Sequence, residues 1–205
     1  MLNKDSGTAT IIDPMQRKLV ATIPISPNTL EFPVSDGAGK IFDNVETTAE
    51  IVVIDTKTRK VTGSYKLAGC EEPSGLAYVA LSKLLISACG NGVAKVVQAE
   101  TGKEVASVPI GRGPDAVIYD PVRKMAFVPC GRDGVLEVIS LADLGHVAVV
   151  QHVQTQAGSR TGTIDPGTGR LYLMASKPDP NAAVPPGGRG APRLAGSWEV
   201  LVVGP

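Results

Sequence analysis

The chain has 205 residues, and its 20 basic and 20 acidic side chains leave a formal net charge of zero. This balance excludes a long-range field that would draw the whole chain to nucleic acid or anionic lipid, although charge can still segregate on one face. No stretch approaches the roughly 20 apolar residues that cross a bilayer, so we expect no membrane partner. The first residues also lack the apolar segment of a signal peptide.

Short apolar runs of Val, Ile and Leu, punctuated by Gly, Pro, Asp and Asn, predict β-strands along the chain. Pro73 matches Pro114 and Cys89 matches Cys130, both 41 positions apart, so the strands belong to a repeat. Four strands in a unit of this length predict an all-β propeller of four-stranded antiparallel blades, with about four blades' worth in this chain. In chain order we expect a half blade over 8–25, blades over 28–66, 74–109 and 115–151, and an incomplete last blade over 160–204. Together they would form a single propeller domain, or a fragment of one, over 1–205.

The segments IVVIDTKTRKVTGSYKLAGCEEPSGLAY (51–78), VPIGRGPDAVIYDP (108–121) and GSWEVLVVG (196–204) resemble the YVTN-repeat propellers called YncE-like. The resemblance covers nearly the whole chain. It implies seven blades and a periplasmic or extracellular location, so this chain resembles an N-terminally truncated member with about four of the seven. An open arc of blades leaves sheet faces uncovered, and we therefore expect self-association or a complementary chain.

One segment departs from the repeat. Residues 177–197 lengthen the last connection between second and third strands and are dominated by Pro, Gly and Ala. Such a composition buries too little apolar area to offset its ordering entropy, so we expect a mobile insert.

In propeller wiring, the connections from fourth to first strand and from second to third strand emerge at one end of the blades, here called the top face. The stretch AGCEEPSG (68–75) and the turns at 89–92 and 130–134 lie on it. We expect a ligand, either a small molecule or a protein, to bind there. The candidate binding residues start the inner strands or lie in the surrounding loops: Glu31, Ser74, Asp115 and Arg160, with Glu71, Glu72, Arg112 and Arg132.

Cys70 and Cys89 bracket the entrance of one blade, and Cys130 takes the place of Cys89 one blade later. Three interpretations remain open: a Cys70–Cys89 disulfide, reduced half-buried thiols, or a zinc site. Neither His146 nor His152 falls in these loops, so the sequence shows no Cys–His pair, and we assign no metal ligands.

The interpretation we adopt is a non-catalytic binding scaffold without a cofactor and without catalytic residues. The first alternative is nucleic-acid binding through basic turns on the opposite face, at Lys57, Arg59, Lys60, Lys103, Arg123, Lys124 and Arg170. The second is a lactonase-like or metal- or quinone-dependent enzyme, as related propellers are. Such an enzyme needs a ring of ligands at the channel, and Glu31 with Asp115 supplies too few.

Overall fold

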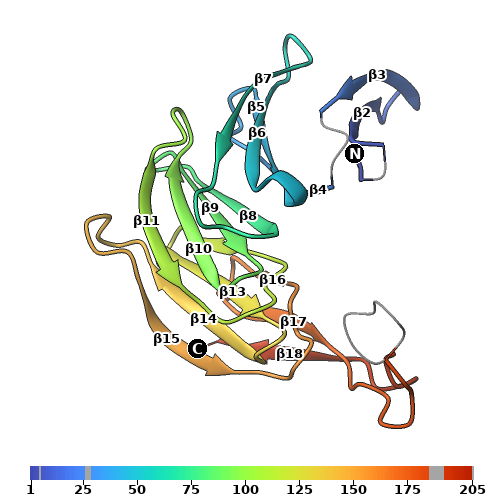
Figure 1. Cartoon of the computed structure of the whole chain (residues 1–205), viewed down its shortest axis with the longest axis vertical. Helices are drawn as coiled ribbons and strands as arrows, with labels where there is room; N and C mark the ends of the chain where they lie inside the picture. Colours follow the sequence, from blue (N-terminus) through green and yellow to red (C-terminus); the bar gives the residue numbers. More distant parts are fainter. Residues whose placement is uncertain (5, 26–28, 185–191, 205) are drawn as a thin grey trace. The chain divides into compact units, whose positions relative to one another are not determined.

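A computed structural model describes residues 1–4, 6–25, 29–184 and 192–204 (Figure 1). The described residues form five antiparallel sheets, one short 3-10 helix, η1 (Glu46–Thr48), and no α-helix. None of their helical segments has the length and apolarity to span a membrane. The chain divides into two compact units, Met1–Pro109 and Ile110–Pro205, and each is described by itself.

Unit 1 contains three sheets. The first sheet is β1 (Leu2–Asn3), β2 (Thr8–Asp13) and β3 (Lys18–Pro24). The second is β4 (Leu30–Ser35), β5 (Lys40–Val45), β6 (Glu50–Asp55) and β7 (Lys60–Lys66). The third is β8 (Pro73–Val79), β9 (Leu84–Cys89), β10 (Val93–Gln98) and β11 (Glu104–Pro109). The first sheet therefore has β1 in addition to the two strands expected from residues 8–25.

Unit 2 contains two sheets. The fourth sheet is β12 (Ile118–Asp120), β13 (Met125–Cys130), β14 (Val135–Ser140) and β15 (Ala148–Gln154). The fifth is β16 (Gly162–Ile164), β17 (Leu171–Ala175) and β18 (Glu199–Val203). In every sheet, sequential strands pair as neighbours, so each sheet is an antiparallel meander.

The repeat is also visible in the β-bulges, which occur at equivalent places in four of the sheets. A β-bulge interrupts the pairing of third and fourth strands between Val53 and Ile54, and at the equivalent places Ile11/Ile12, Val96/Val97 and Val138/Ile139. A bulge adds one residue and increases the local twist of the strand. The same twist therefore recurs in all four of these strand pairs.

Turn chemistry explains where the third strands end. In the turn after β6, Asp55 Oδ1 accepts hydrogen bonds from the backbone N–H and the hydroxyl of Thr58, at 2.6 and 2.8 Å. Arg59 then takes a left-handed backbone with φ +58°, and Arg17 does the same after β2 with φ +52°. A short acceptor side chain followed by a left-handed residue is what a tight reversal requires.

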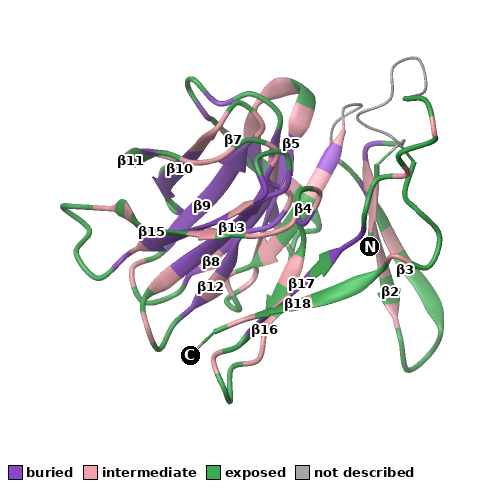
Figure 2. Ribbon diagram, turned by 90° about the horizontal axis from the view of Figure 1, so that it is seen from below, coloured by how far each residue is buried: buried purple, intermediate pink, exposed green. Residues whose placement is uncertain are grey.

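The core lies between successive sheets within each unit. We call the side of a sheet that packs on the next sheet its forward face, and the other side its backward face. In unit 1, Phe42, Ile51 and Val53 of the second sheet pack with Leu85 and Val97 of the third. In unit 2, Phe127, Leu136 and Val138 of the fourth sheet pack with Leu171 and Leu173 of the fifth. Figure 2 shows β8, β9 and β13 as buried and much of β3 and β18 as exposed.

The described ends of the 177–197 segment hydrogen-bond to each other. The backbone N–H of Asp179 donates to Pro192 O at 2.8 Å, and that of Leu194 donates to Lys177 O at 2.9 Å. The centre of the expected mobile insert, residues 185–191, lies outside the described residues.

Candidate binding face

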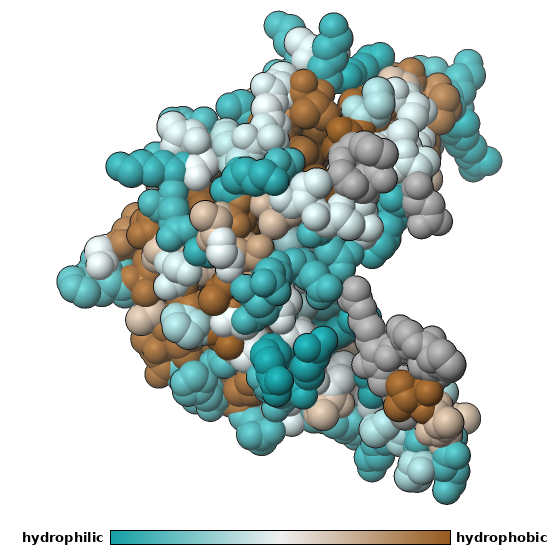
Figure 3. Space-filling model, in the orientation of Figure 1, coloured by the Kyte–Doolittle hydropathy of each residue, from teal (hydrophilic) through white to brown (hydrophobic). Residues whose placement is uncertain are grey.

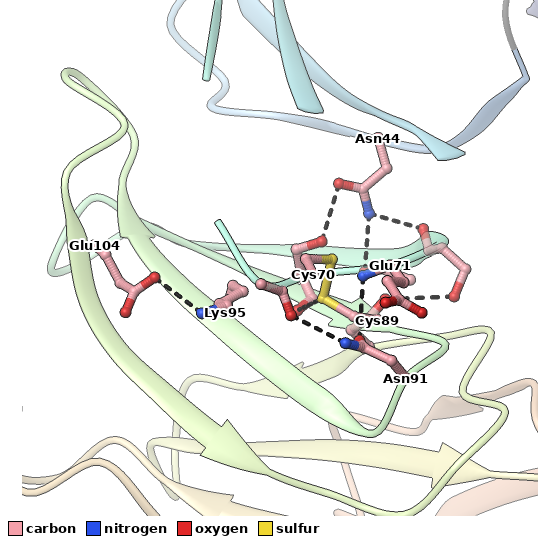
Figure 4. The surroundings of a disulfide bond; sticks show 12 residues. Asn44, Cys70, Glu71, Cys89, Asn91, Lys95 and Glu104 are labelled. Carbon is pink, nitrogen blue, oxygen red and sulfur yellow. Dashed lines mark hydrogen bonds and ion pairs between the residues drawn. A yellow bond between two sulfur atoms is a disulfide. The ribbon is translucent and has the colours of Figure 1, made fainter. Parts of the chain in front are cut away.

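The loop between β7 and β8 is cross-linked to the end of β9. The structure joins Cys70 and Cys89 in a disulfide, with their Cα atoms 5.5 Å apart (Figure 4). Asn91 adds a second link, because its Nδ2 donates to Gly69 O at 3.0 Å and its Oδ1 accepts from the Glu71 N–H at 3.2 Å. The two top connections of the third sheet are thereby held together at several points.

Cys130 has no such partner because of one glycine. Gly111 stands 41 positions after Cys70, as Cys130 stands 41 after Cys89, so Gly111 occupies the place of the missing cysteine. A Cβ on Gly111 would lie 2.8 Å from Cys130 Cβ. Burial raises the pKa of the Cys130 thiol to about 12, and the thiol therefore stays protonated and a poor nucleophile at neutral pH.

The cross-linked loop presents two free carboxylates. Glu71 and Glu72 are exposed, and their side chains form no ion pair or hydrogen bond among the described residues. Glu72 has a left-handed backbone with φ +49°, and a Cβ on Gly90 would lie 3.0 Å from its Oε2. Gly90 thus leaves the room that the Glu72 side chain uses. Ser74, one of the predicted binding residues, follows on β8, and its carbonyl accepts a hydrogen bond from Asn44.

Glu31 lies at the start of β4, the inner strand next to β8. Lys4 Nζ is 2.5 Å from its Oε1 and 3.7 Å from Glu46 Oε2. Burial raises the pKa of Glu31, and the Lys4 ammonium opposes that rise. Glu31 and Ser74 therefore begin adjacent inner strands at the same end of unit 1, as the repeat predicts, and Glu31 already has an ion-pair partner in the chain itself.

Below Glu31 lies a buried carboxylate that the sequence analysis missed. Asp43 on β5 is fully buried, and neither oxygen accepts a hydrogen bond of ordinary geometry from the described residues. Burial, reinforced by the nearby Glu31 charge, raises the pKa of Asp43 to about 8, and the Glu31 backbone N–H offsets only part of this. Asp43 is therefore mostly a neutral acid at pH 7.

The equivalent position in the next sheet shows what Asp43 lacks. Ser87 on β9 takes the place of Asp43, and its hydroxyl lies 3.1 Å from Asn44 Oδ1 in the preceding sheet. In the second sheet, Asn44 pairs with Ile51. Ala9 is the residue of the first sheet that corresponds to Ile51, and it pairs with Leu2. By this register, the apolar Leu2 therefore occupies the position at which the second sheet has the amide of Asn44.

In unit 2, three of the four predicted binding residues form ion pairs. Arg160 Nε is 3.4 Å from Asp115 Oδ2, which joins the approaches to β16 and β12. Arg112 donates through Nη2 to Asp133 Oδ1 at 2.8 Å, and this contact lowers the pKa of Asp133. Arg132 is exposed and makes no ion pair with the described residues. Glu31, Glu71, Glu72 and Ser74 thus belong to unit 1, and the arginines and Asp115 to unit 2.

Both histidines form ion pairs with carboxylates. His152 Nδ1 is within ion-pair distance of the buried Glu137, and His146 is paired with Asp143 in a turn. Among the described residues, no three His, Cys, Asp or Glu side chains are placed to hold a metal ion. The arrangement on the top face can therefore attract and orient charged groups, and it shows no nucleophile–base pair.

A cavity of about 360 Å³ lies between the fourth and fifth sheets of unit 2. Its walls are mainly apolar and include Phe127, Val138, Val153 and Val203. Arg123 also lines it, but this guanidinium already donates to Gly169 O at 2.8 Å and to Asp120 at 3.2 Å. Apolar side chains are visible at the surface around β14 and β15, at the lower left of Figure 3. The cavity continues the apolar interface between the sheets and offers no free charge.

No family model and no curated protein matches the sequence. Many chains of known structure are similar to it. One is the Kuenenia stuttgartiensis hydrazine synthase, which is 16% identical over 89% of this chain, with a TM-score of 0.75. This chain spans 53% of the length of that chain. At this identity the likeness concerns the fold alone, and it confirms the predicted fold: the chain is a partial β-propeller of four-stranded antiparallel blades.

Proposed function

We propose that this chain is a non-catalytic binding scaffold of the YncE-like family, which takes its ligand or protein partner on the top face. The observation that carries the proposal is the pair Glu71 and Glu72, two free carboxylates on a loop tied down by the Cys70–Cys89 disulfide. A loop that is already ordered loses little conformational entropy when a ligand binds. We assign the chain to that family because segments 51–78, 108–121 and 196–204 resemble its repeats.

The free charges indicate the chemistry of the ligand. In unit 1, Glu31 and Glu46 share the ammonium of Lys4, whereas Glu71 and Glu72 form no ion pair among the described residues. Two adjacent exposed carboxylates attract a cationic group, such as the lysine or arginine side chains of a partner protein. We therefore propose a cationic ligand for this loop.

The test is a titration with a fluorescent lysine-rich peptide against the wild-type chain and the double variant E71Q/E72Q. Loss of two exposed charge contacts should weaken binding about tenfold, which corresponds to roughly 1.4 kcal/mol. The control variant E100Q/D143N removes two exposed carboxylates from turns between third and fourth strands and should bind like the wild type. Equal affinity for E71Q/E72Q and the wild type would refute the top-face proposal.

Nucleic-acid binding is a second candidate, supported by the turn after β6. Lys57, Arg59 and Lys60 are exposed there, and none forms an ion pair among the described residues. Such a turn can contact phosphates without reading sequence. A salt-dependent shift of a labelled oligonucleotide that disappears in K57E/K60E would favour this candidate over the first.

We also propose an oxidising location, periplasmic or extracellular, for this protein. The Cys70–Cys89 disulfide supports it, because disulfides persist mainly in such compartments. Thiol titration of the protein isolated from its native source, unfolded without reductant, should then find one reactive cysteine, Cys130. Three reactive thiols would contradict the proposal.

A further inference from the structure

Two carboxylates on the top face of unit 1 converge on one ammonium. Glu31 lies on β4 and Glu46 begins η1, and their side chains are only 20% and 14% exposed. The Glu46 N–H donates to Thr29 O at 2.9 Å, which holds η1 beside the start of β4. Lys4 Nζ is 2.5 Å from Glu31 Oε1 and 3.7 Å from Glu46 Oε2. The fold of unit 1 thus contains a formed place for an ammonium group.

The ammonium is the exposed member of this group. The Lys4 side chain is 57% exposed and follows β1, a strand of only two residues. Glu31 and Glu46, by contrast, are carried by β4 and by the end of β5, which pair with each other in a four-stranded sheet. An ion pair with an exposed ammonium opens at little cost, because water solvates the separated charge. An ammonium from outside can therefore take the place of Lys4 without a change in the sheet.

The carboxyl groups outnumber the cation that serves them. Glu31 and Glu46 share the single charge of Lys4. Below them Asp43 is fully buried, and its oxygens accept no hydrogen bond of ordinary geometry from the described residues. Burial and the Glu31 charge together raise the pKa of Asp43, so the negative charge of Glu31 is felt inside the sheet. The environment of the pair therefore favours a bound cation.

The arrangement favours an ammonium over a metal ion. Among the described residues, no three His, Cys, Asp or Glu side chains are placed to hold a metal ion. An ammonium needs only hydrogen-bond acceptors, and its three N–H donors can serve two carboxylates at once. The contacts of Lys4 with Glu31 and Glu46 show this geometry directly.

We propose that Glu31 and Glu46 form a subsite for the primary ammonium group of a ligand, either a free amine or the lysine side chain of a partner protein, which replaces Lys4 when it binds. Lys4 is then an internal competitor that fills the subsite until a ligand displaces it. The inference rests on the proposed function for the cationic nature of the ligand. The subsite contains neither Glu71 nor Glu72, so the two proposals can fail separately.

The test compares the wild type, K4Q and the control K83Q in titrations with butylamine and with the lysine-rich peptide. K4Q removes the competitor, so both ligands should bind it about fivefold more tightly than the wild type. K83Q also removes an exposed ammonium from an ion pair with a glutamate, Glu100, and should bind both ligands like the wild type. A gain with butylamine shows that a free amine fills the subsite, and a gain confined to the peptide identifies a protein lysine as the occupant.

Two further variants tie the gain to this subsite. K4R keeps a cation at the position and should bind like the wild type, whereas K4Q/E31Q should lose the gain of K4Q because one charged acceptor is gone. Equal affinities of K4Q and the wild type for both ligands would overturn the proposal. So would an equal gain in K83Q, or a gain that persists in K4Q/E31Q. If E71Q/E72Q binds the peptide like the wild type, the proposed function fails, and the butylamine titration of K4Q still decides the subsite.

Discussion

Asp43 provides the sharpest test of the buried chemistry in unit 1. Asp43→Asn replaces the carboxyl with a neutral amide of nearly the same shape. The folded state of the wild type holds a proton on Asp43 up to a pKa of about 8, whereas the ordinary pKa is 3.8. The folded state therefore binds this proton more tightly than the unfolded state. Stability from this group is fully present below pH 4 and is lost as the pH rises through 8.

The size of the effect follows from the two pKa values. Between pH 5 and pH 9 the proton affinity of the two states differs over roughly three pH units, and each unit is worth about 1.4 kcal/mol. The free energy of unfolding of the wild type should fall by about 4 kcal/mol over this range relative to Asp43→Asn.

The assay is urea denaturation at pH 5, 7 and 9 for wild type, Asp43→Asn and the exposed-loop control Glu71→Gln. We expect the wild type and Glu71→Gln to lose stability in parallel with rising pH, and Asp43→Asn to lose much less. Parallel curves for wild type and Asp43→Asn would show that Asp43 is ionised in the folded state, and the assigned environment would be wrong.

Three further predictions concern the cross-links and the buried amide. The double variant C70S/C89S should lose about 3 kcal/mol of unfolding free energy, because the disulfide closes a loop of 19 residues; an unchanged denaturation midpoint would contradict this. Asn44→Ala should cost roughly 2–4 kcal/mol by chemical denaturation, since the amide donates to Ser74 O and Gly75 O inside the core; a loss below 1 kcal/mol would contradict it. Gly111→Cys, combined with Val135→Ala to relieve the closest contact, should form a second disulfide with Cys130 once the backbone shifts to widen the 2.8 Å between the two Cβ atoms to about 3.8 Å, so that thiol titration of the unfolded, oxidised protein finds no free cysteine rather than one.

The blade architecture could be predicted from the sequence because the repeat consists of local sequence features. The Asp, Thr and Gly residues of the turns, the apolar alternation and the 41-residue spacing each depend on neighbours within one sheet. The expected strand connections placed Cys70 near Cys89 and left the disulfide as one of three interpretations, and the structure shows that disulfide. The repeat also placed Glu31 and Ser74 at the starts of adjacent inner strands.

Asp43 was missed for a different reason. A single polar residue in an otherwise apolar strand gives no sequence signal of a site. Whether its side chain finds a hydrogen-bond partner depends on which side chain faces it from the preceding sheet. By the register of the repeat, that position falls on Leu2, which lies on a strand of two residues too short to show any periodicity. The ion pairs of Lys4 with Glu31 and of Arg160 with Asp115 are likewise set by loop conformations between sheets, which repeat spacing alone does not determine.

The most direct test of the top-face claim is a chemical-shift titration of the isotope-labelled chain with the lysine-rich peptide. We expect the largest backbone amide shifts on residues 69–72 and 90–92, the two connections that the disulfide joins, and we expect these shifts to vanish in E71Q/E72Q. Shifts confined to the turn at 57–60, or spread evenly over exposed carboxylates, would contradict it.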